Sequence, residues 1–233
     1  MRYLVKPEVF EINPRLHFGI IVGKELKNSE TRPEDTARLR AAENKARQIL
    51  KAEDLRNDPT VLGYRNVMEK AGINPNKYPP STEAMLKRIL KGGSLPEINA
   101  LVDLCNAVSV ENRISLGGHD IKDIHEDLSV GFTKGNERFL PFGADEYEPV
   151  EAGELVFTSG ATVQTRKWIW RQSELGKMEL NTREVFFQLV GFEDSEGSPL
   201  LQALHSLEVL ITERFGGSYK RYIVKQDSPE IEF

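Results

Sequence analysis

The spacing of apolar residues changes from helical to strand-like near residue 117, and this change constrains the fold more than any other feature. From Pro33 to Val110 the apolar residues recur with the period of amphipathic helices. After Gly117-Gly118 they alternate, or form short runs between Gly, Asp and Asn residues, as is typical of strands. One more helical segment, from Pro199 to Phe215, follows these strands. The order predicts an α+β fold without a repeating βαβ unit.

Four helices are expected in the first half of the chain and one near its end. They span residues 33–55, 60–71, 81–90, 96–110 and 199–215. Pro33 suits a first helical turn, Ser81 suits an N-cap, and Gly72 suits a helix end. Ser198 is expected to cap the closing helix, and Gly216-Gly217 to end it.

Strand patterns occupy the second half of the chain and its beginning. The expected strands of the second half span residues 128–132, 138–142, 154–157, 162–170, 184–190 and 219–224. At the beginning, one strand is expected around Pro7, from Tyr3 to Ile12, and another from His17 to Val22. Residues 1–30 are therefore assigned as N-terminal strands, with an appended hairpin as one interpretation, and residues 31–233 as the main domain.

The composition indicates a globular protein and favours the cytoplasm. Hydrophobic residues make up 39% and charged residues 29% of the 233 residues, which argues against a disordered chain. Apolar runs such as 18–22 are too short to span a bilayer, and the N-terminus has no signal-peptide core before Pro7. The single cysteine, Cys105, can form neither an intramolecular disulfide nor a thiolate zinc cluster. We expect a cytoplasmic location, no membrane partner, and no metal or other cofactor.

The net charge of −5 argues against a protein that holds nucleic acid constitutively, because such proteins usually carry a surplus of Lys and Arg. A local basic patch could still bind RNA weakly. The candidate is a run of five basic residues, Arg38, Arg40, Lys45, Arg47 and Lys51. The alternative is a solvated helix face, which composition favours.

Motifs for known chemistries are few. No Walker loop, dinucleotide-binding glycine motif, nucleophile elbow or His-Glu-x-x-His is present, and Gly117-Gly118 is interpreted as a turn. His119 and His125 lie among acidic residues, and an exposed acidic loop is favoured over a metal site there. Cys105 is interpreted as a buried apolar residue rather than a nucleophile. The segment 168–172 contains two Trp residues and Arg171. It fits either a ligand-stacking wall or a core strand with a salt bridge.

Two adjacent segments resemble the editing domain of the bacterial phenylalanyl-tRNA synthetase β subunit, the B3/B4 domain. The first, Ile98-Asn99-Ala100-Leu101-Val102-Asp103-Leu104-Cys105-Asn106-Ala107-Val108, is similar to that domain's pocket helix, which typically reads Asn-Asn-Val-Val-Asp-Val-Thr-Asn-Tyr-Val. The second, Ser115-Leu116-Gly117-Gly118-His119-Asp120, is similar to the family's Pro-Leu-His-Ala-Phe-Asp. Looser likeness extends over residues 55–225.

This resemblance implies one α+β domain with a sandwich-like sheet core flanked by helices. It also implies a pocket for the aminoacyl group of a tRNA. The resemblance does not extend to a synthetase catalytic domain, so the implied activity is hydrolysis of mischarged aminoacyl-tRNA in trans, with weak or transient tRNA binding. The alternative is a non-catalytic module that binds tRNA or an aminoacyl ligand. A small-molecule sensor or an unrelated hydrolase that uses the same pocket is a third interpretation.

The site residues carry over position by position. Asp103, Asn106 and Asp120 match the family pattern, whereas Cys105, Gly117 and Gln188 stand where the family has Thr, His and Glu. The catalytic candidates are Asn106, His119, Gly117 and Gly118. The substrate-binding candidates are Asn99, Asp103, Cys105, Asp120, Trp170, Arg171 and Gln188.

The expected roles follow the chemistry of ester hydrolysis. Amides and backbone N–H groups would stabilise the oxyanion, and His119 would act as a base. Asp103 or Asp120 would bind the α-ammonium or, alternatively, anchor the helix and the loop. Arg171 would contact the terminal phosphate, and Trp170 would form a wall of the pocket.

Overall fold

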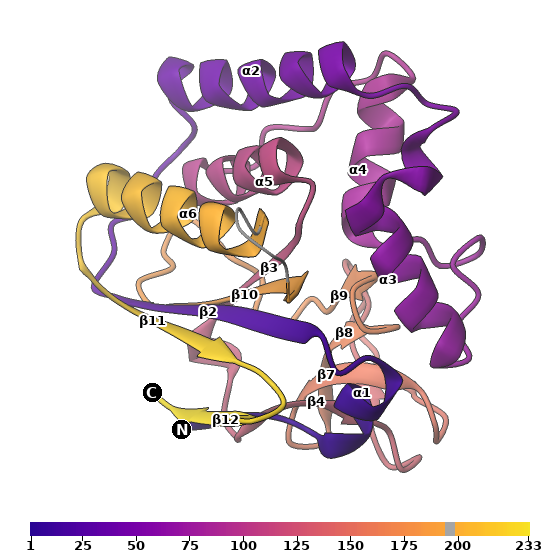
Figure 1. Cartoon of the computed structure of the whole chain (residues 1–233). Coiled ribbons are helices and arrows are strands. Elements are labelled where there is room, and N and C mark those ends of the chain that lie inside the picture. Colours follow the sequence, from indigo (N-terminus) through magenta and orange to yellow (C-terminus); the bar gives the residue numbers. More distant parts are fainter. Residues whose placement is uncertain (194–198) are drawn as a thin grey trace.

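Two β-sheets and a layer of helices make up the protein (Figure 1). The computed structural model describes residues 1–193 and 199–233. Its helices are α1 (Pro7–Ile12), α2 (Pro33–Ile49), α3 (Pro59–Lys70), α4 (Ser81–Leu90), α5 (Ala100–Asn112) and α6 (Pro199–Phe215), with 3₁₀ turns at Leu55–Asn57 and Ile121–Asp123. Its strands are β1 (Arg2–Val5), β2 (Leu16–Lys24), β3 (Ser115–Asp120), β4 (Leu128–Phe132), β5 (Arg138–Phe139), β6 (Glu148–Pro149), β7 (Leu155–Ser159), β8 (Thr162–Arg166), β9 (Arg171–Gln172), β10 (Val185–Phe192), β11 (Ser218–Val224) and β12 (Glu230–Glu232).

The smaller sheet has the strand order β11-β2-β10-β3 and is antiparallel throughout. Helices α5 and α6 cover one of its faces, and α2 lies across them as an outer layer (Figure 1). Apolar residues of α5, α6 and the sheet form one buried cluster, which includes Leu104, Phe187 and Leu204. Because β3 is the last strand in this order, one of its edges is not paired within the sheet.

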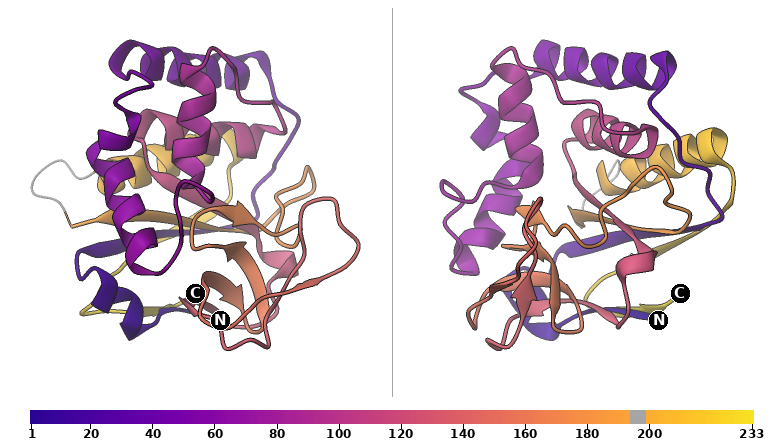
Figure 2. Two further views of the ribbon diagram at one scale, coloured as in Figure 1. Left: turned by 90° about the vertical axis from the view of Figure 1, so that its right-hand side faces the viewer. Right: turned by 180° about the vertical axis from the view of Figure 1, so that it is seen from behind.

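The larger sheet packs against the other face of the smaller sheet, so the two form a sandwich. Its order is β12-β1-β4-β7-β8-β5-β6, with β9 paired to β8. Aromatic rings from both sheets meet between them: the ring centroids of Tyr3 and Phe186 are 5.3 Å apart, and those of Phe157 and Phe186 are 6.0 Å apart. The termini lie side by side where β1 pairs with β12 (Figure 2). The expected α+β sandwich flanked by helices is confirmed.

The beginning of the chain corrects one prediction. Residues 7–12, expected to be extended, form α1, with Pro7 in its first turn. Strands β1 and β2 belong to different sheets, so the N-terminal hairpin is not formed. Instead, β1 pairs with β4 and β12, and β2 lies between β10 and β11.

Four more boundaries differ from the sequence-based expectation by three residues or more. The first long helix ends at Ile49, and the helix expected from residue 96 begins at Ala100, because Asn99 caps it by accepting a hydrogen bond from the Val102 amide. The strand expected over 162–170 ends at Arg166, where Lys167 and Trp168 adopt positive φ angles of 50° and 66°. The strand expected over 138–142 ends at Phe139. The predicted N-cap Ser198 lies outside the described residues.

None of the helices that the structure describes is long and apolar enough to cross a membrane.

Candidate functional site

Strand β3 divides the predicted site residues between two faces of the smaller sheet. Gly117 and Gly118 lie within this strand, opposite Gln188 and Phe187 of β10, so the expected turn at the diglycine pair is wrong. Alternate residues of a strand point to opposite faces. Leu116 and Gly118 therefore face α5, whereas Gly117 and His119 face the larger sheet. Two separate cavities result.

The first cavity, called here the α5 groove, lies between α5 and β3 and has a volume of about 170 Å³. Predicted residues Cys105, Asn106 and Gly118 line it, and most of its other lining side chains are apolar. Burial raises the pKa of the Cys105 thiol well above its usual range, so the thiol stays protonated. This groove therefore holds no activated nucleophile among its described lining residues.

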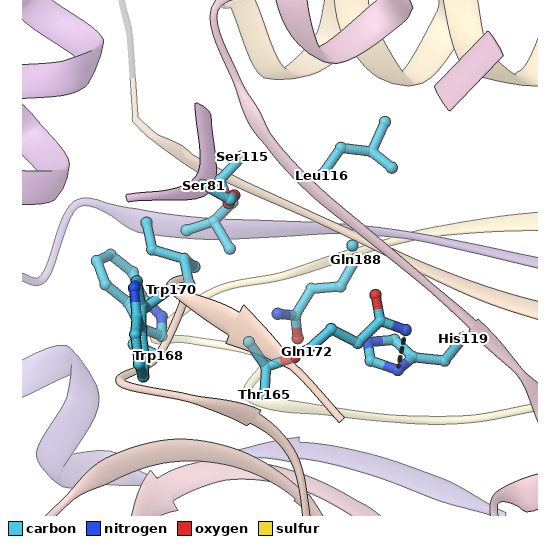
Figure 3. Close-up of a pocket in the computed structure, with 12 residues that line it drawn as sticks. Ser81, Ser115, Leu116, His119, Thr165, Trp168, Trp170, Gln172 and Gln188 are labelled. Atoms are coloured by element: carbon cyan, nitrogen blue, oxygen red, sulfur yellow. Dashed lines mark hydrogen bonds between the residues drawn. The ribbon is translucent and has the colours of Figure 1, made fainter. Parts of the chain in front are cut away.

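The second cavity, called here the inter-sheet cavity, has a volume of about 80 Å³, enough for several water molecules (Figure 3). It is lined by residues of β3, β10, β8, β9, the turn after β8 and the start of α4. These are Ser81, Ser115, Leu116, Gly117, His119, Thr165, Trp168, Ile169, Trp170, Gln172, Gln188 and Val190. Four predicted site residues meet here: Gly117, His119, Trp170 and Gln188. Leu116 and Gln172 line both cavities, so they form the wall between them.

His119 is buried and neutral. Its exposed fraction is 1%, its ring packs edge-on against Phe157 with a centroid distance of 5.1 Å, and burial lowers its pKa to about 4. The amide Nε2 of Gln172 lies 3.4 Å from His119 Nδ1. An amide nitrogen can only donate, and Gln172 Nε2 also donates to the Gly118 carbonyl at 2.9 Å; the contact with Nδ1 favours the tautomer that carries the ring proton on Nε2. The expectation of an exposed acidic loop at His119 and Asp120 is therefore wrong, because both residues are buried.

The Nε2–H group of His119 lies on the wall of the inter-sheet cavity. A Cβ atom added at Gly117 would come 3.6 Å from this nitrogen, which places it beside Gly117 on the same face of β3. Among the described residues, Nε2 has no hydrogen-bond partner.

Gln188 supplies a second N–H donor to the inter-sheet cavity. Tyr3 donates its hydroxyl to Gln188 Oε1 at 2.7 Å, and burial raises the Tyr3 pKa well above its usual value, so the hydroxyl keeps its proton. This contact fixes the orientation of the amide and leaves Nε2 without a partner among the residues that the structure describes. Gln188 on β10 pairs with Gly117 on β3, which lies two residues before His119. The side chains of Gln188 and His119 therefore face the same side of the sheet.

The rim of the inter-sheet cavity is aromatic and basic. The rings of Trp170 and Tyr78 meet at a centroid distance of 4.8 Å, and the exposed Arg171 guanidinium lies 5.9 Å from the Trp170 ring. A hydrogen bond from Lys77, together with the charges of Lys77, Lys167 and Arg166, lowers the pKa of Tyr78. Arg166 and Lys167 are paired with Glu154, whereas Lys77 and Arg171 have no ion-pair partner among the described residues.

Three predicted substrate-binding residues are instead occupied by structural contacts. Asp103 accepts hydrogen bonds from Thr31 Oγ1 at 2.6 Å and from the Ile98 amide at 3.0 Å. Asp120 accepts from Thr182 Oγ1 at 2.5 Å and from the Lys122 amide at 3.0 Å. Asn99 caps α5 and also donates to the Met178 carbonyl at 3.1 Å. These contacts favour the structural interpretation of each residue.

The basic run on α2 is largely neutralised by ion pairs. Arg38 pairs with Glu111 at 2.6 Å, and the buried Glu43 lies 2.6 Å from Arg40 and 3.6 Å from Arg47. Lys45 and Lys51 are exposed. The contacts favour a solvated helix face that is tied to α5 and to the segment after α4, rather than an RNA-binding patch.

Within residues 1–193 and 199–233, no group of three or more His, Cys, Asp or Glu side chains could hold a metal ion.

The family model of the B3/4 domain matches residues 63–198, which is more than half of the chain. The chain belongs to the B3/4 domain family. A solved structure, an N-terminal fragment of the phenylalanyl-tRNA synthetase β subunit from Pyrococcus horikoshii, is 12% identical to this chain and superposes with a TM-score of 0.44. The match covers 93% of this chain and 49% of that fragment, so this chain spans about half of its length. No curated protein sequence matches the chain.

The B3/4 match includes both cavities, but sequence reasoning missed three residues that shape the inter-sheet cavity. Tyr3 is 185 positions away from Gln188, and Gln172 reaches across the free edge of β3 to donate to the Gly118 carbonyl at 2.9 Å. Trp168 is fully buried, and its Nε1–H has no hydrogen-bond partner in the described part of the chain. The aromatic segment 168–172 was the available signal for Trp168 and Gln172. No local signal marks Tyr3.

Proposed function

We propose that this B3/4 protein hydrolyses mischarged aminoacyl-tRNA in trans, in the cytoplasm, with the ester carbonyl bound in the inter-sheet cavity. One observation carries the proposal: His119 Nε2–H and Gln188 Nε2–H line the same cavity, and neither has a protein partner in the described part of the chain. Pre-oriented donors of this kind stabilise the charge that develops on a carbonyl oxygen during acyl transfer. The resemblance of β3 and α5 to an editing domain supports an aminoacyl ester as the group whose carbonyl binds in this cavity.

The proposed role of His119 is electrophilic. A histidine with a pKa of about 4 is a weak base at neutral pH, but its neutral imidazole donates a hydrogen bond well. Tyr3 positions Gln188 through the buried hydrogen bond, and Gln172 favours the tautomer of His119 that donates from Nε2. The hydroxyls of Ser115 and Thr165, which line the same cavity, are available to hold a water molecule.

The reaction needs little further assistance. Water attacks the ester carbonyl carbon, and the oxyanion forms opposite the two N–H donors. The bond from the carbonyl carbon to the ribose oxygen then breaks, and that oxygen takes up a proton. The vicinal ribose hydroxyl assists its departure. The products are a free amino acid and an uncharged tRNA.

The RNA end would lie on the rim. Trp170 and Tyr78 offer faces for stacking, and Arg171 offers an unpaired guanidinium within the described structure for the terminal phosphate. The α2 run is not part of this proposal, because its arginines are engaged in ion pairs.

A non-catalytic binding module is the second candidate. The observation that favours it is the chemistry of the cavity lining, which among the described residues contains no carboxylate and no histidine with a pKa near neutrality. This candidate predicts that the protein retains an aminoacyl-RNA analogue without turnover.

The deciding experiment is a deacylation assay over a panel of mischarged tRNAs with two substitutions of one residue. His119→Leu removes the donor and should lower the rate by about 100-fold, whereas His119→Gln supplies an amide N–H and should retain most of the rate. The matched controls are His205→Leu and His205→Gln, because His205 is exposed on α6. Equal loss in both His119 variants would contradict the donor role. No release above the buffer rate by the unsubstituted protein would reject hydrolysis.

A further inference from the structure

The inter-sheet cavity is small for a site that accepts an aminoacyl group. Its volume is about 80 Å³, whereas an apolar cavity that binds benzene has a volume of about 150 Å³. The α5 groove, with about 170 Å³, offers more room, but the wall that contains Leu116 and Gln172 separates it from the cavity. Gln172 is held in this wall because its amide donates to the Gly118 carbonyl at 2.9 Å. The cavity therefore has room for a small side chain but not for an aromatic ring.

The size of the cavity limits the side chain because of how an aminoacyl ester is built. Its Cα atom is bonded directly to the ester carbonyl carbon. A guest whose carbonyl oxygen reaches His119 and Gln188 therefore brings its side chain to the walls of the same cavity. A side chain larger than the cavity would have to displace packed groups, such as the His119 ring that lies edge-on against Phe157.

Hydroxyl groups line the cavity beside the two N–H donors (Figure 3). They belong to Ser81, Ser115 and Thr165. The hydroxyl oxygens of Ser81 and Ser115 lie 3.4 Å apart, and the Thr165 hydroxyl has no hydrogen-bond partner among the described residues. Because a hydroxyl both donates and accepts hydrogen bonds, these groups suit a guest that carries a hydroxyl of its own. A methyl group in the same place would displace water from them without replacing its hydrogen bonds.

We propose that the inter-sheet cavity selects aminoacyl esters whose side chain is small and carries a hydroxyl group, with serine as the best fit, and excludes aromatic side chains. This inference rests on the proposed function for its reaction, and it names the class of substrate on which that reaction acts. Thr165 binds the hydroxyl of the guest, which leaves Ser115 to hold the attacking water. Gln172 closes the cavity towards the α5 groove.

The test compares esters of one tRNA that differ only in the side chain of the amino acid. The tRNA is charged with serine, alanine, phenylalanine or tyrosine, and each hydrolysis rate is corrected for its own buffer rate. The seryl ester should have a kcat/KM about 10-fold above that of the alanyl ester and about 100-fold above those of the aromatic esters. An alanyl or aromatic ester that is cleaved as fast as the seryl ester, or faster, would overturn the inference and leave the proposed function standing.

Substitution of Thr165 tests the hydroxyl contact. Thr165 is half-buried on β8. Thr165→Val keeps the shape of the side chain but removes its hydroxyl, so the ratio of the seryl rate to the alanyl rate should fall by about 10-fold. The matched variant Thr165→Ser keeps a hydroxyl and should retain the ratio. The same ratio in both variants would contradict the role of this hydroxyl. Thermal melting of each variant checks that the fold is retained.

Substitution of Gln172 tests the exclusion of large side chains. Gln172→Ala opens the wall towards the α5 groove, so the phenylalanyl rate should rise by about 10-fold relative to the seryl rate. Gln172→Met has a side chain of similar length without an N–H donor, and it should keep the exclusion. An equal rise in both variants, or no rise in Gln172→Ala, would contradict the role of the wall.

A binding measurement separates this inference from the failure of hydrolysis. If no ester is cleaved, 3′-amide adenosine analogues that carry a seryl, an alanyl or a phenylalanyl group are titrated while the intrinsic fluorescence of Trp168 and Trp170 is recorded. Tightest binding of the seryl analogue supports the inference even without turnover. Equal binding of the three, tightest binding of either other analogue, or no binding at all overturns it.

Discussion

Acidification should lower the free energy of unfolding of this protein, because burial lowers the pKa of His119. The pKa of His119 falls from 6.5 to about 4 in the folded protein because its ring is desolvated, so the unfolded chain binds a proton first as the pH drops. The contribution of the neutral His119 ring to the free energy of unfolding is fully present above pH 6.5, and it is lost as the pH falls towards 4. Each unit of pKa shift corresponds to about 1.4 kcal/mol, so the loss is about 2 kcal/mol at pH 5 and about 3 kcal/mol at pH 4.

His119→Gln isolates this contribution, because glutamine does not titrate and retains an amide N–H. Urea unfolding of both proteins at pH 7, 6, 5 and 4 gives the two pH profiles, and their difference removes the effect of the other titrating groups. The unsubstituted protein should lose about 3 kcal/mol more than the variant between pH 7 and pH 4. Parallel profiles, within about 0.5 kcal/mol, would refute the account of a buried neutral imidazole.

Three further predictions concern the two glycines of β3, the exposed Arg171 and the buried Cys105. Gly118→Ala should destabilise the fold by about 1–3 kcal/mol in urea titrations, since its Cβ would come 2.5 Å from Met178 Cε and 2.9 Å from the Phe187 ring. Gly117→Ala, whose Cβ would meet His119 Nε2 at 3.6 Å and no other described atom within 4 Å, should retain stability but lower deacylation by narrowing the cavity, and equal stability losses in both variants would contradict the geometry. Arg171→Ala should reduce the salt dependence of tRNA binding by about one unit of log–log slope, whereas the ion-paired Arg47→Ala should leave it unchanged, and the reverse result would move the RNA contact to α2. Alkylation of Cys105 by iodoacetamide at pH 8 should be slow until the chain is unfolded, because burial keeps the thiol protonated; rapid labelling of the native protein would contradict this.

Much of the fold could be predicted from local patterns. The limits of α4, α6 and β4 are those expected, although the N-cap of α4 is Pro80 and not Ser81, which is the first helical residue. These elements are governed by periodicity and by end residues, which a sequence displays directly. The B3/4 family was likewise recognisable from the two segments of α5 and β3.

The errors arose where tertiary contacts decide local structure. Gly117 and Gly118 resemble a turn, yet both lie in a strand. Gly118 lacks a side chain there because Met178 and Phe187 occupy the space that a Cβ would need. Residues 7–12 have strand-like composition but form α1, because Pro7 begins a helical turn between two strands of different sheets. Neither constraint is visible in the sequence around these residues.

The candidate site was predicted in its residues more than in its arrangement. The resemblance implied one aminoacyl pocket, but alternation along β3 places Gly118 in the α5 groove, with Cys105 and Asn106, and places Gly117 and His119 in the inter-sheet cavity, with Gln188. The hydrogen bond from Tyr3 to Gln188 depends on which strands the two sheets bring together. Such long-range partners follow from topology, which hydrophobic periodicity does not determine.

The central claim is that the inter-sheet cavity binds an acyl carbonyl group through two unpartnered N–H donors. A crystal structure with a non-hydrolysable 3′-acylamido adenosine tests it most directly. We predict that the acyl oxygen lies within about 3 Å of both His119 Nε2 and Gln188 Nε2, and that the adenosine contacts Trp170. An analogue bound in the α5 groove beside Cys105 and Asn106, with the inter-sheet cavity holding only water, would contradict the account.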